Sequence, residues 1–277
     1  MDVALPSGSS HYVFPDPRGG GRTITVYAHR PAAFAPESPV VVVMHGRNRN
    51  GGDYRDWWVA PAEHHGALVI APEFSERDYA HPDDYNYGSM FAPDGRPRPR
   101  SQWLFPVIDQ VFLDCRERAG SRADRYFLFG HSAGGQVVHR LATFGWSDRI
   151  ELAVAANAGS YTMPLVDEPF PFGLRGTGFG MAELRALLAR PLLVLLGESD
   201  NDPEHFQLPR EPGAMRQGPH RFARGQHYFE TGRREVARLG VDFGWKIATV
   251  PGIAHSGEFM SPAAAAHLFA AMPVAAD

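Results

Sequence analysis

A chain of 277 residues, 44% of them hydrophobic, is long enough to bury a full core, and we expect a single domain over residues 1–277 with loop insertions. The net charge of −4 provides no general attraction to nucleic acid or to an acidic membrane surface, so we expect no nucleic-acid partner. The single cysteine, Cys115, excludes an intramolecular disulfide.

The first ten residues contain no basic segment followed by an apolar core, which is the pattern of a secretory signal. With Met1 as the native start we expect a cytoplasmic protein, whereas a chain from which a signal peptide had been removed would be secreted. No apolar run approaches the roughly 20 residues that a membrane helix needs. We therefore expect a soluble protein without a membrane span.

The chain begins with segments that are typical of strands. Residues 11–14 and 23–28 alternate polar and apolar side chains, which predicts an antiparallel hairpin that turns at residues 19–21. The continuous apolar runs 39–44 and 67–71 predict strands that are buried on both faces of a sheet.

Between and after these runs we expect helices and a long loop. Residues 54–64 predict a helix that Pro61 interrupts near its middle. Residues 73–100 have many turn-forming residues and several aromatic ones, so we expect an ordered insertion near the site. Residues 103–118 carry apolar side chains at helical spacing, with Cys115 among them as a core residue.

The second half of the chain alternates between the two kinds of element. The expected strands and helices are strand 126–129, helix 136–144, strand 152–156, helix 181–190, strand 192–196, helix 227–239, strand 245–250 and helix 263–271. Residues 159–180 form a second insertion that is rich in proline, glycine and aromatic residues. This alternation predicts an α/β fold with a mostly parallel central sheet and helices on both faces.

Ser132 lies between a predicted strand and a predicted helix, in the sequence Gly130-His131-Ser132-Ala133-Gly134. A serine on such a sharp turn crowds its neighbours, so the residues two before and two after it must be very small. Gly130 and Gly134 meet this demand, which makes Ser132 a candidate nucleophile.

Two further polar sites follow the ends of predicted strands, namely the loop of Asp200 and the loop of His255. Open α/β sheets place their ligands at these strand ends. A serine hydroxyl is a weak nucleophile, so His255 would take its proton, and a carboxylate would orient the imidazole. Glu198 and Asp202 lie in the same loop as Asp200 and are alternatives for the acid.

An oxyanion that develops during acyl transfer needs hydrogen-bond donors placed in advance. The backbone amide of Ala133, at the start of a helix, is one expected donor. The other is expected from the loop after residues 39–44, where Gly46 or Arg47 is positioned to supply it.

With these residues, from His45-Gly46 through the Ser132 motif to Gly197 with Asp200 and Gly252 with His255, the chain resembles the α/β-hydrolase superfamily, and within it bacterial esterases and polymer depolymerases. The order Ser, Asp, His is that of the superfamily. The resemblance implies the α/β-hydrolase fold and a Ser132-Asp200-His255 triad. The superfamily's alternative acid position holds Asn157 here, so no carboxylate is available there.

The remaining histidines and acidic residues indicate no further chemistry. His131 is expected to be structural, and His64, His65 and His139 lack the spacing of metal ligands. Asp83 and Asp84 have no further spaced oxygen ligands for calcium. We expect neither a metal nor another cofactor.

Arg47 and Arg49 flank the expected oxyanion loop and are candidates for substrate binding, because arginine binds carboxylates through paired hydrogen bonds. Tyr161, in the second insertion, is a third candidate. The arginines between residues 210 and 224 would join them if their loop folds over the site, which would suit an anionic polymer such as poly(aspartic acid). Ordinary surface arginines are the alternative interpretation.

The sequence thus predicts a serine hydrolase that cleaves a carboxylic ester, in a small molecule or a polymer, through an acyl-enzyme. Hydrolysis of an amide or polyamide by the same triad is the nearest alternative. A non-catalytic binding protein on the same fold is the alternative of another class. The oligomeric state is left open.

Overall fold

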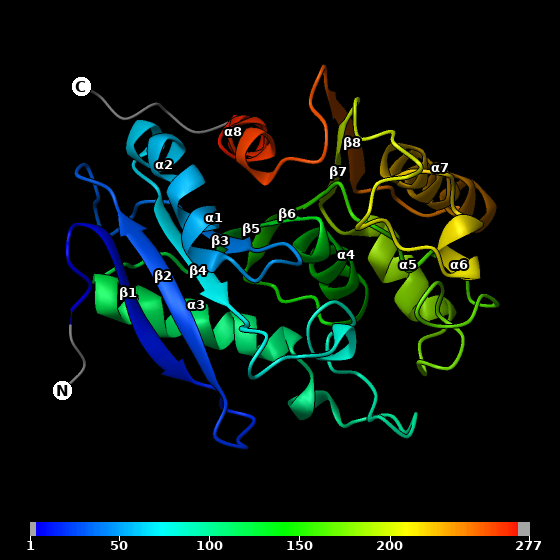
Figure 1. Ribbon diagram of the computed structural model, residues 1–277, viewed down its shortest axis with the longest axis horizontal. Helices are drawn as coiled ribbons and strands as arrows, with labels where there is room; N and C mark the ends of the chain where they lie inside the picture. Colours follow the sequence, from blue (N-terminus) through cyan, green and yellow to red (C-terminus); the bar gives the residue numbers. More distant parts are fainter. Residues whose placement is uncertain (1–3, 271–277) are drawn as a thin grey trace.

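A single sheet of eight strands organises this computed structural model, which describes residues 4–270 (Figure 1). The strands are β1 (Gly8–Pro15), β2 (Thr23–Arg30), β3 (Val40–Met44), β4 (Leu68–Glu73), β5 (Tyr126–His131), β6 (Ile150–Ala156), β7 (Leu192–Gly197) and β8 (Trp245–Val250). Their order across the sheet is β1-β2-β4-β3-β5-β6-β7-β8. The expected fold class, a mostly parallel α/β sheet, is confirmed.

Within the described part of the chain, β2 is the strand that runs opposite to the others, so its two pairings are antiparallel. The predicted hairpin pairs β1 with β2, with Gly8 opposite Arg30, and β2 pairs antiparallel with β4. From β4 to β8 every pairing is parallel. The carboxyl ends of β3, β5, β7 and β8 therefore meet at one edge, which is where the chain places its polar loops.

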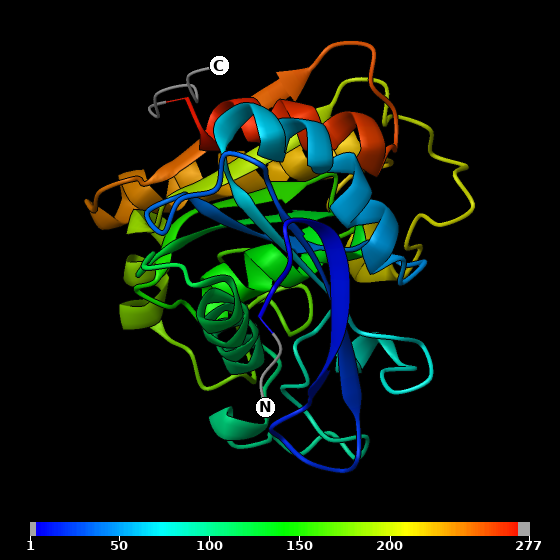
Figure 2. The ribbon, with the colours of Figure 1, turned by 90° about the vertical axis from the view of Figure 1, so that its left-hand side faces the viewer.

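Helices cover both faces of the sheet (Figure 2). The α-helices are α1 (Gly51–Trp57), α2 (Val59–His65), α3 (Phe105–Ala119), α4 (Ala133–Phe144), α5 (Met181–Ala189), α6 (Pro212–Met215), α7 (Arg221–Leu239) and α8 (Gly257–Leu268). In β3 the even-numbered valines pack with α3 and α4, and Val41 and Val43 pack on the opposite face with α1, α2 and α8. Because both faces of β3 are buried, its sequence is apolar at every position.

Several expected helices have different limits in the structure, among them α4, which begins at Ala133 instead of residue 136. The break in the expected helix 54–64 lies at Trp58, because Pro61 sits in the first turn of α2, where a proline costs little. Helix α7 begins at Arg221 instead of residue 227, and α8 begins at Gly257 instead of residue 263, after Ser256 caps its amino end. The expected end of that last helix, at residue 271, lies outside the described residues.

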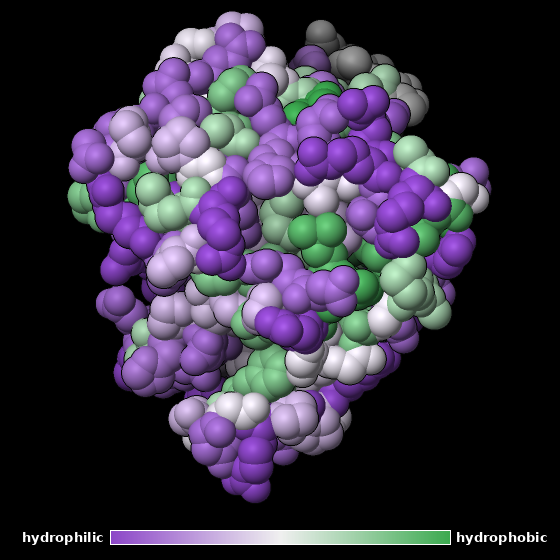
Figure 3. All heavy atoms as spheres, turned by 90° about the vertical axis from the view of Figure 1, so that its right-hand side faces the viewer, coloured by the Kyte–Doolittle hydropathy of each residue, from purple (hydrophilic) through white to green (hydrophobic). Residues whose placement is uncertain are grey.

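The insertion 73–100 contains one short 3-10 turn, η1 (Pro82–Asp84), and a second, η2 (Arg100–Gln102), follows it. None of the helices within residues 4–270 has the length and apolarity needed to cross a bilayer. The side of the molecule that carries α5, α6 and α7 is mostly hydrophilic, with hydrophobic residues gathered near its middle (Figure 3).

Candidate active site

Ser132 occupies the sharp turn between β5 and α4, with φ 59° and ψ −115°. A side chain in this backbone region is strained, and such strain concentrates at functional sites. A Cβ atom on Gly130 would lie 2.3 Å from the carbonyl oxygen of Gly134, and one on Gly134 would lie 2.1 Å from that of Met44. Both flanking glycines are thus required by the close approach of backbone that the sequence predicted.

A continuous chain of hydrogen bonds joins Ser132 to His255 and Asp200. The Oγ of Ser132 lies 2.9 Å from Nε2 of His255, and Nδ1 of His255 lies 2.7 Å from Oδ2 of Asp200. These side chains come from the ends of β5, β8 and β7. Because a carboxylate can only accept, Nδ1 carries the proton in the neutral imidazole, and Nε2 is left to accept from the serine hydroxyl.

The two alternative acids of the same loop have other partners. Glu198 accepts a hydrogen bond from the hydroxyl of Thr249 at 2.7 Å, and Asp202 accepts one from the backbone N–H of Glu204 at 2.8 Å. Both are exposed, whereas Asp200 is buried. Of these three carboxylates in the described structure, Asp200 is the one in contact with His255.

Arg221, the first residue of α7, contacts the second oxygen of Asp200. Its Nη1 lies 3.3 Å from Oδ1, and its side chain is 1% exposed. Burial lowers the pKa of His255; hydrogen bonding to Asp200 opposes this shift, and the Arg221 charge adds to it. An imidazole with a lowered pKa is neutral at pH 7 and able to accept a proton.

Asn157 connects the loops of Asp200 and His255. Its Oδ1 accepts from the N–H of Gly197 at 2.8 Å, and its Nδ2 donates to the carbonyl of Ala254 at 3.4 Å. The residue is fully buried with φ 45°, a conformation that asparagine tolerates better than most residues. The position that lacks a carboxylate therefore holds an amide that links the two loops.

His45 fixes the loop that follows β3. Its Nε2 accepts from the N–H of Phe74 at 3.0 Å, so its Nδ1 carries the proton and donates to the carbonyl of Gly46 at 2.9 Å. Burial lowers the pKa of His45 to about 3, so the ring is neutral. The ring also stacks on Tyr85, whose hydroxyl donates to the carbonyl of His45 at 2.8 Å.

The expected oxyanion donors lie beside Ser132. A Cβ atom on Gly46 would be 3.7 Å from Cβ of Ser132, and Ala133 and Arg47 line the same cavity as Ser132. The amide of Ala133 belongs to the first turn of α4, whose N–H groups have no partner within the helix. Their role as donors remains a prediction.

His131, expected to be structural, is buried beside His255 and borders a cavity next to Ser132. Its ring lies 4.7 Å from that of His255, and its Nδ1 lies 2.9 Å from the hydroxyl of Tyr54. Burial lowers its pKa well below the usual value of histidine, so it is neutral.

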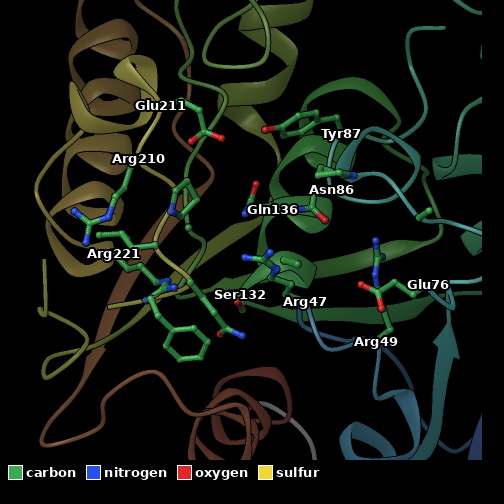
Figure 4. A pocket seen from close by; sticks show the side chains of 18 residues that line it. Arg47, Arg49, Glu76, Asn86, Tyr87, Ser132, Gln136, Arg210, Glu211 and Arg221 are labelled. Atoms are coloured by element: carbon green, nitrogen blue, oxygen red, sulfur yellow. The ribbon is translucent and has the colours of Figure 1, made fainter. Parts of the chain in front are cut away.

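Two cavities open beside Ser132. The larger, of about 460 Å³, is lined by Arg47, Arg49, Gln136, Arg221 and the segment 206–211, among others (Figure 4). The smaller, of about 210 Å³, is lined by Tyr54, Trp57 and His255. Ser132, Arg47 and Gln207 line both. The side chain of Gln207 donates to that of Asn48 at 3.2 Å, which joins the loops on either side of the opening.

The expected substrate-binding residues separate in the structure. Arg47 and Arg49 line the larger cavity, but Tyr161 is fully buried and stacks on Tyr228 with 4.5 Å between ring centroids, so its expected contact with substrate is wrong. Of the later arginines, Arg210 and Arg221 line the cavity. Arg224 instead donates to the carbonyl of Gly159 in the interior.

The two insertions also differ in their role. The first lines the larger cavity with five residues, from Glu76 to Tyr87, whereas among the described residues the second contributes Gly159 alone. The segment 206–211 forms a further part of the wall of this cavity. Phe206 in that segment is 86% exposed.

The sequence did not indicate that Gln136 and Arg140 of α4, together with the neighbouring His139, form a buried hydrogen-bond network. Arg140 donates to the hydroxyl of Thr162 at 3.0 Å and to the carbonyl of Asn86 at 3.0 Å, which joins the two insertions, and Gln136 accepts from it at 3.1 Å. His139 accepts from the N–H of Thr162 at 2.9 Å. Their spacing, i, i+3 and i+4 on an otherwise apolar helix, was the available signal.

An arrangement of this kind supports acyl transfer. A hydroxyl beside a neutral imidazole can lose its proton as it attacks a carbonyl, and a buried carboxylate stabilises the imidazolium that results. An adjacent helix amino end supplies N–H groups to a developing oxyanion.

Comparison with solved structures finds two that align along nearly the whole chain. LpqC, a poly(3-hydroxybutyrate) depolymerase from Bordetella parapertussis, is 40% identical, with 97% of this chain and 92% of that chain covered and a TM-score of 0.91. Poly(aspartic acid) hydrolase-1 from Sphingomonas sp. KT-1 is 39% identical, with coverages of 94% and 98% and a TM-score of 0.90.

Comparison with curated sequences gives a more distant match. The bifunctional acetylxylan esterase/xylanase XynS20E of Neocallimastix patriciarum is 26% identical over 137 residues, which is 46% of this chain and 18% of that protein. The chain thus spans less than a fifth of that curated relative. No family model matches the chain.

Proposed function

The chain belongs to the α/β-hydrolase superfamily, and from this membership we propose that it is a serine hydrolase that cleaves carboxylic esters through an acyl-enzyme. The hydrogen-bonded chain from Ser132 through His255 to Asp200 carries the proposal. Relatives named as depolymerase and esterase support the ester as the bond that is cleaved.

Acylation uses Ser132 as nucleophile and His255 as base. Nε2 of His255 takes the hydroxyl proton while Oγ bonds to the ester carbon, and the carbonyl electrons move onto oxygen. The C–O bond to the alcohol then breaks, and the same proton passes from Nε2 to the leaving oxygen. The backbone N–H groups of Ala133 and of Gly46 or Arg47 stabilise the oxyanion.

Deacylation repeats these steps with water. A water molecule loses a proton to Nε2 of His255 and attacks the acyl carbon, and the proton returns to Oγ of Ser132 as the acid leaves. Asp200 orients the imidazole and stabilises its charged form in both halves of the reaction.

The test is Ser132→Ala, assayed on p-nitrophenyl butyrate and by labelling with a fluorophosphonate. We expect the wild-type chain to be labelled on Ser132, and the folded variant to be unlabelled and to retain less than about 1% of turnover. Turnover by the folded variant above a few per cent would remove Ser132 from the nucleophile role. A wild-type chain that neither turns over esters nor takes the label would instead be a binding protein.

Amide cleavage by the same residues is the second candidate. It is favoured by the likeness to a poly(aspartic acid) hydrolase and by the arginines that line the larger cavity. Turnover of p-nitrophenyl butyrate, butyryl p-nitroanilide and poly(aspartate) under the same conditions separates the two functions. An ester hydrolase turns over the first substrate alone.

A further inference from the structure

The position of His255 distinguishes the two cavities beside Ser132. His255 is among the described residues that line the smaller cavity but not among those that line the larger one. In the proposed reaction His255 protonates the departing oxygen, so the leaving alcohol must lie next to Nε2. The smaller cavity therefore accommodates the alcohol, and the larger one accommodates the acyl chain.

The two cavities differ in charge. Four arginines and two glutamates line the larger cavity, whereas Arg47 and Glu258 are the charged pair of the smaller one. Arg47 lines both cavities and cannot distinguish between them. Arg49 and Arg221 belong to the larger cavity, and in Figure 4 they lie on opposite sides of Ser132.

Arg49 and Arg221 each carry a nitrogen without a partner. Nη1 of Arg49 and Nε of Arg221 are buried and find no hydrogen-bond acceptor among residues 4–270. Their other nitrogens are held in place, because Nη2 of Arg49 donates to the carbonyl of Tyr79 at 3.0 Å and Nη1 of Arg221 contacts Asp200. A buried cationic N–H group without an acceptor is costly, and an anionic ligand would satisfy it.

The glutamates of the larger cavity do not cancel this charge. Glu76 and Glu211 are exposed, so water and salt screen them, whereas Arg221 is buried and Arg49 is half-buried against the ring of Tyr85. Within the described residues no carboxylate forms an ion pair with Arg49. Water and salt screen these exposed carboxylates, and Arg221 is already paired with the buried carboxylate of Asp200, so Arg49 supplies most of the attraction for an anion.

The smaller cavity has a different lining. The rings of Tyr54 and Trp57 and the amides of Asn48 and Asn50 line it, together with exposed Glu258. Such a lining suits a neutral alcohol with an apolar body and hydrogen-bonding groups.

We propose that the larger cavity is an acyl subsite that binds a carboxylate carried by the acyl chain, and that the smaller cavity is a subsite for a neutral alcohol. Arg49 binds the carboxylate, Arg221 adds positive charge from the other side of Ser132, and the preferred substrates are half-esters of dicarboxylic acids. This assignment rests on the proposed ester hydrolysis.

Two isomeric esters test the assignment with the unmodified protein. Ethyl hydrogen succinate carries its carboxylate on the acyl side, and 3-(propanoyloxy)propanoic acid carries it on the alcohol side. Hydrolysis is followed by titration of the acid released, with neutral ethyl pentanoate as reference. We expect kcat/KM to be at least about tenfold higher for ethyl hydrogen succinate than for its isomer, since a hydrogen bond to a charged group contributes this much or more.

Variants test which arginines are responsible. Arg49→Gln should lower the ratio of kcat/KM for ethyl hydrogen succinate to that for its isomer by about tenfold. Its kcat/KM for ethyl pentanoate should stay within about threefold of the wild-type value. Arg47→Ala should lower kcat/KM equally for the two charged isomers, because Arg47 borders both cavities. Arg216→Gln, at an exposed arginine paired with Glu168, is the matched control and should change none of the three rates.

The outcomes separate the assignment from the function on which it rests. Equal rates for the two isomers, or a preference for 3-(propanoyloxy)propanoic acid, overturn the assignment while hydrolysis of ethyl pentanoate upholds the function. An unchanged preference in Arg49→Gln also overturns it. A chain that hydrolyses none of the esters overturns the proposed function and the assignment together.

Discussion

The guanidinium of Arg221 lies against the carboxylate of Asp200, with Nη1 3.3 Å from Oδ1, on the side opposite His255. Both side chains are at least 97% buried. Asp200 is thus shared between a permanent cation and an imidazole that becomes a cation during the proposed reaction. The permanent cation disfavours the second charge, which sets how readily His255 takes a proton.

The first prediction concerns the pH dependence of turnover. The base must be neutral to act, so kcat/KM falls as pH drops through the pKa of His255, which burial places below 6.5. In Arg221→Met the opposing positive charge is absent, so the fall in kcat/KM on the acidic side should move to higher pH. In Arg221→Lys the charge is kept, so this fall should stay at the wild-type pH. A fall that stays in place in both variants would show that Arg221 acts through Asp200 geometry alone.

The second prediction concerns the acid. Asp200→Asn should lower kcat by roughly 10³ to 10⁴-fold, because an amide cannot stabilise the imidazolium and favours the wrong tautomer. Asp202→Asn, at an exposed residue of the same loop, is the matched control and should lower kcat by less than about threefold. The reverse pattern of rates would move the role to Asp202.

The third prediction concerns Asn157. Asn157→Gly keeps the φ of 45° accessible but removes the amide between Gly197 and Ala254, whereas Asn157→Ala adds backbone strain to the same loss. We expect both variants to lose about tenfold in kcat with KM nearly unchanged, and Asn157→Ala to unfold at lower urea concentration than Asn157→Gly. Full kcat in Asn157→Gly would show that the loops hold their geometry without the amide.

The fourth prediction concerns stability against acid. Burial lowers the pKa of His45, His131 and His139, and for His45 the value is about 3. Between the unfolded pKa near 6.5 and these lower values, the unfolded state binds more protons, so the free energy of unfolding falls as pH falls. Each histidine contributes about 1.4 kcal/mol per pH unit in that window.

Urea unfolding at pH 7.5, 6.5 and 5.5 measures this slope. His139→Gln removes one buried histidine. It should therefore reduce the slope of the free energy of unfolding against pH by the contribution of about one proton. A free energy of unfolding that is unchanged between pH 6.5 and 5.5 would contradict the prediction.

The sheet could be predicted from the sequence because its central strands are buried on both faces. Val40 to Met44 and Leu192 to Leu196 are apolar at every position, and no polar loop resembles them. The serine turn was predictable for a related reason, since the backbone there leaves no room for a side chain at Gly130 or Gly134.

Buried polar residues limited the prediction elsewhere. The beginning of α7 was missed because Arg221 and Arg224 look like surface residues, yet Arg224 donates to the carbonyls of Gly218 and Gly159 inside the protein. Tyr161 was assigned to the substrate because its stretch reads as a loop, whereas its ring lies in the core against Tyr228. Partners distant in sequence satisfy these groups, and local patterns do not reveal them.

The distances along the chain that the site spans have a consequence for folding. His255 lies 55 residues beyond Asp200 and 123 beyond Ser132, and β8, which leads to His255, forms the far edge of the sheet. Contacts so distant in sequence close slowly, after the local ones. On the proposed mechanism the reacting side chains therefore come together late, and a nascent chain on the ribosome would stay inert until β8 has emerged and docked.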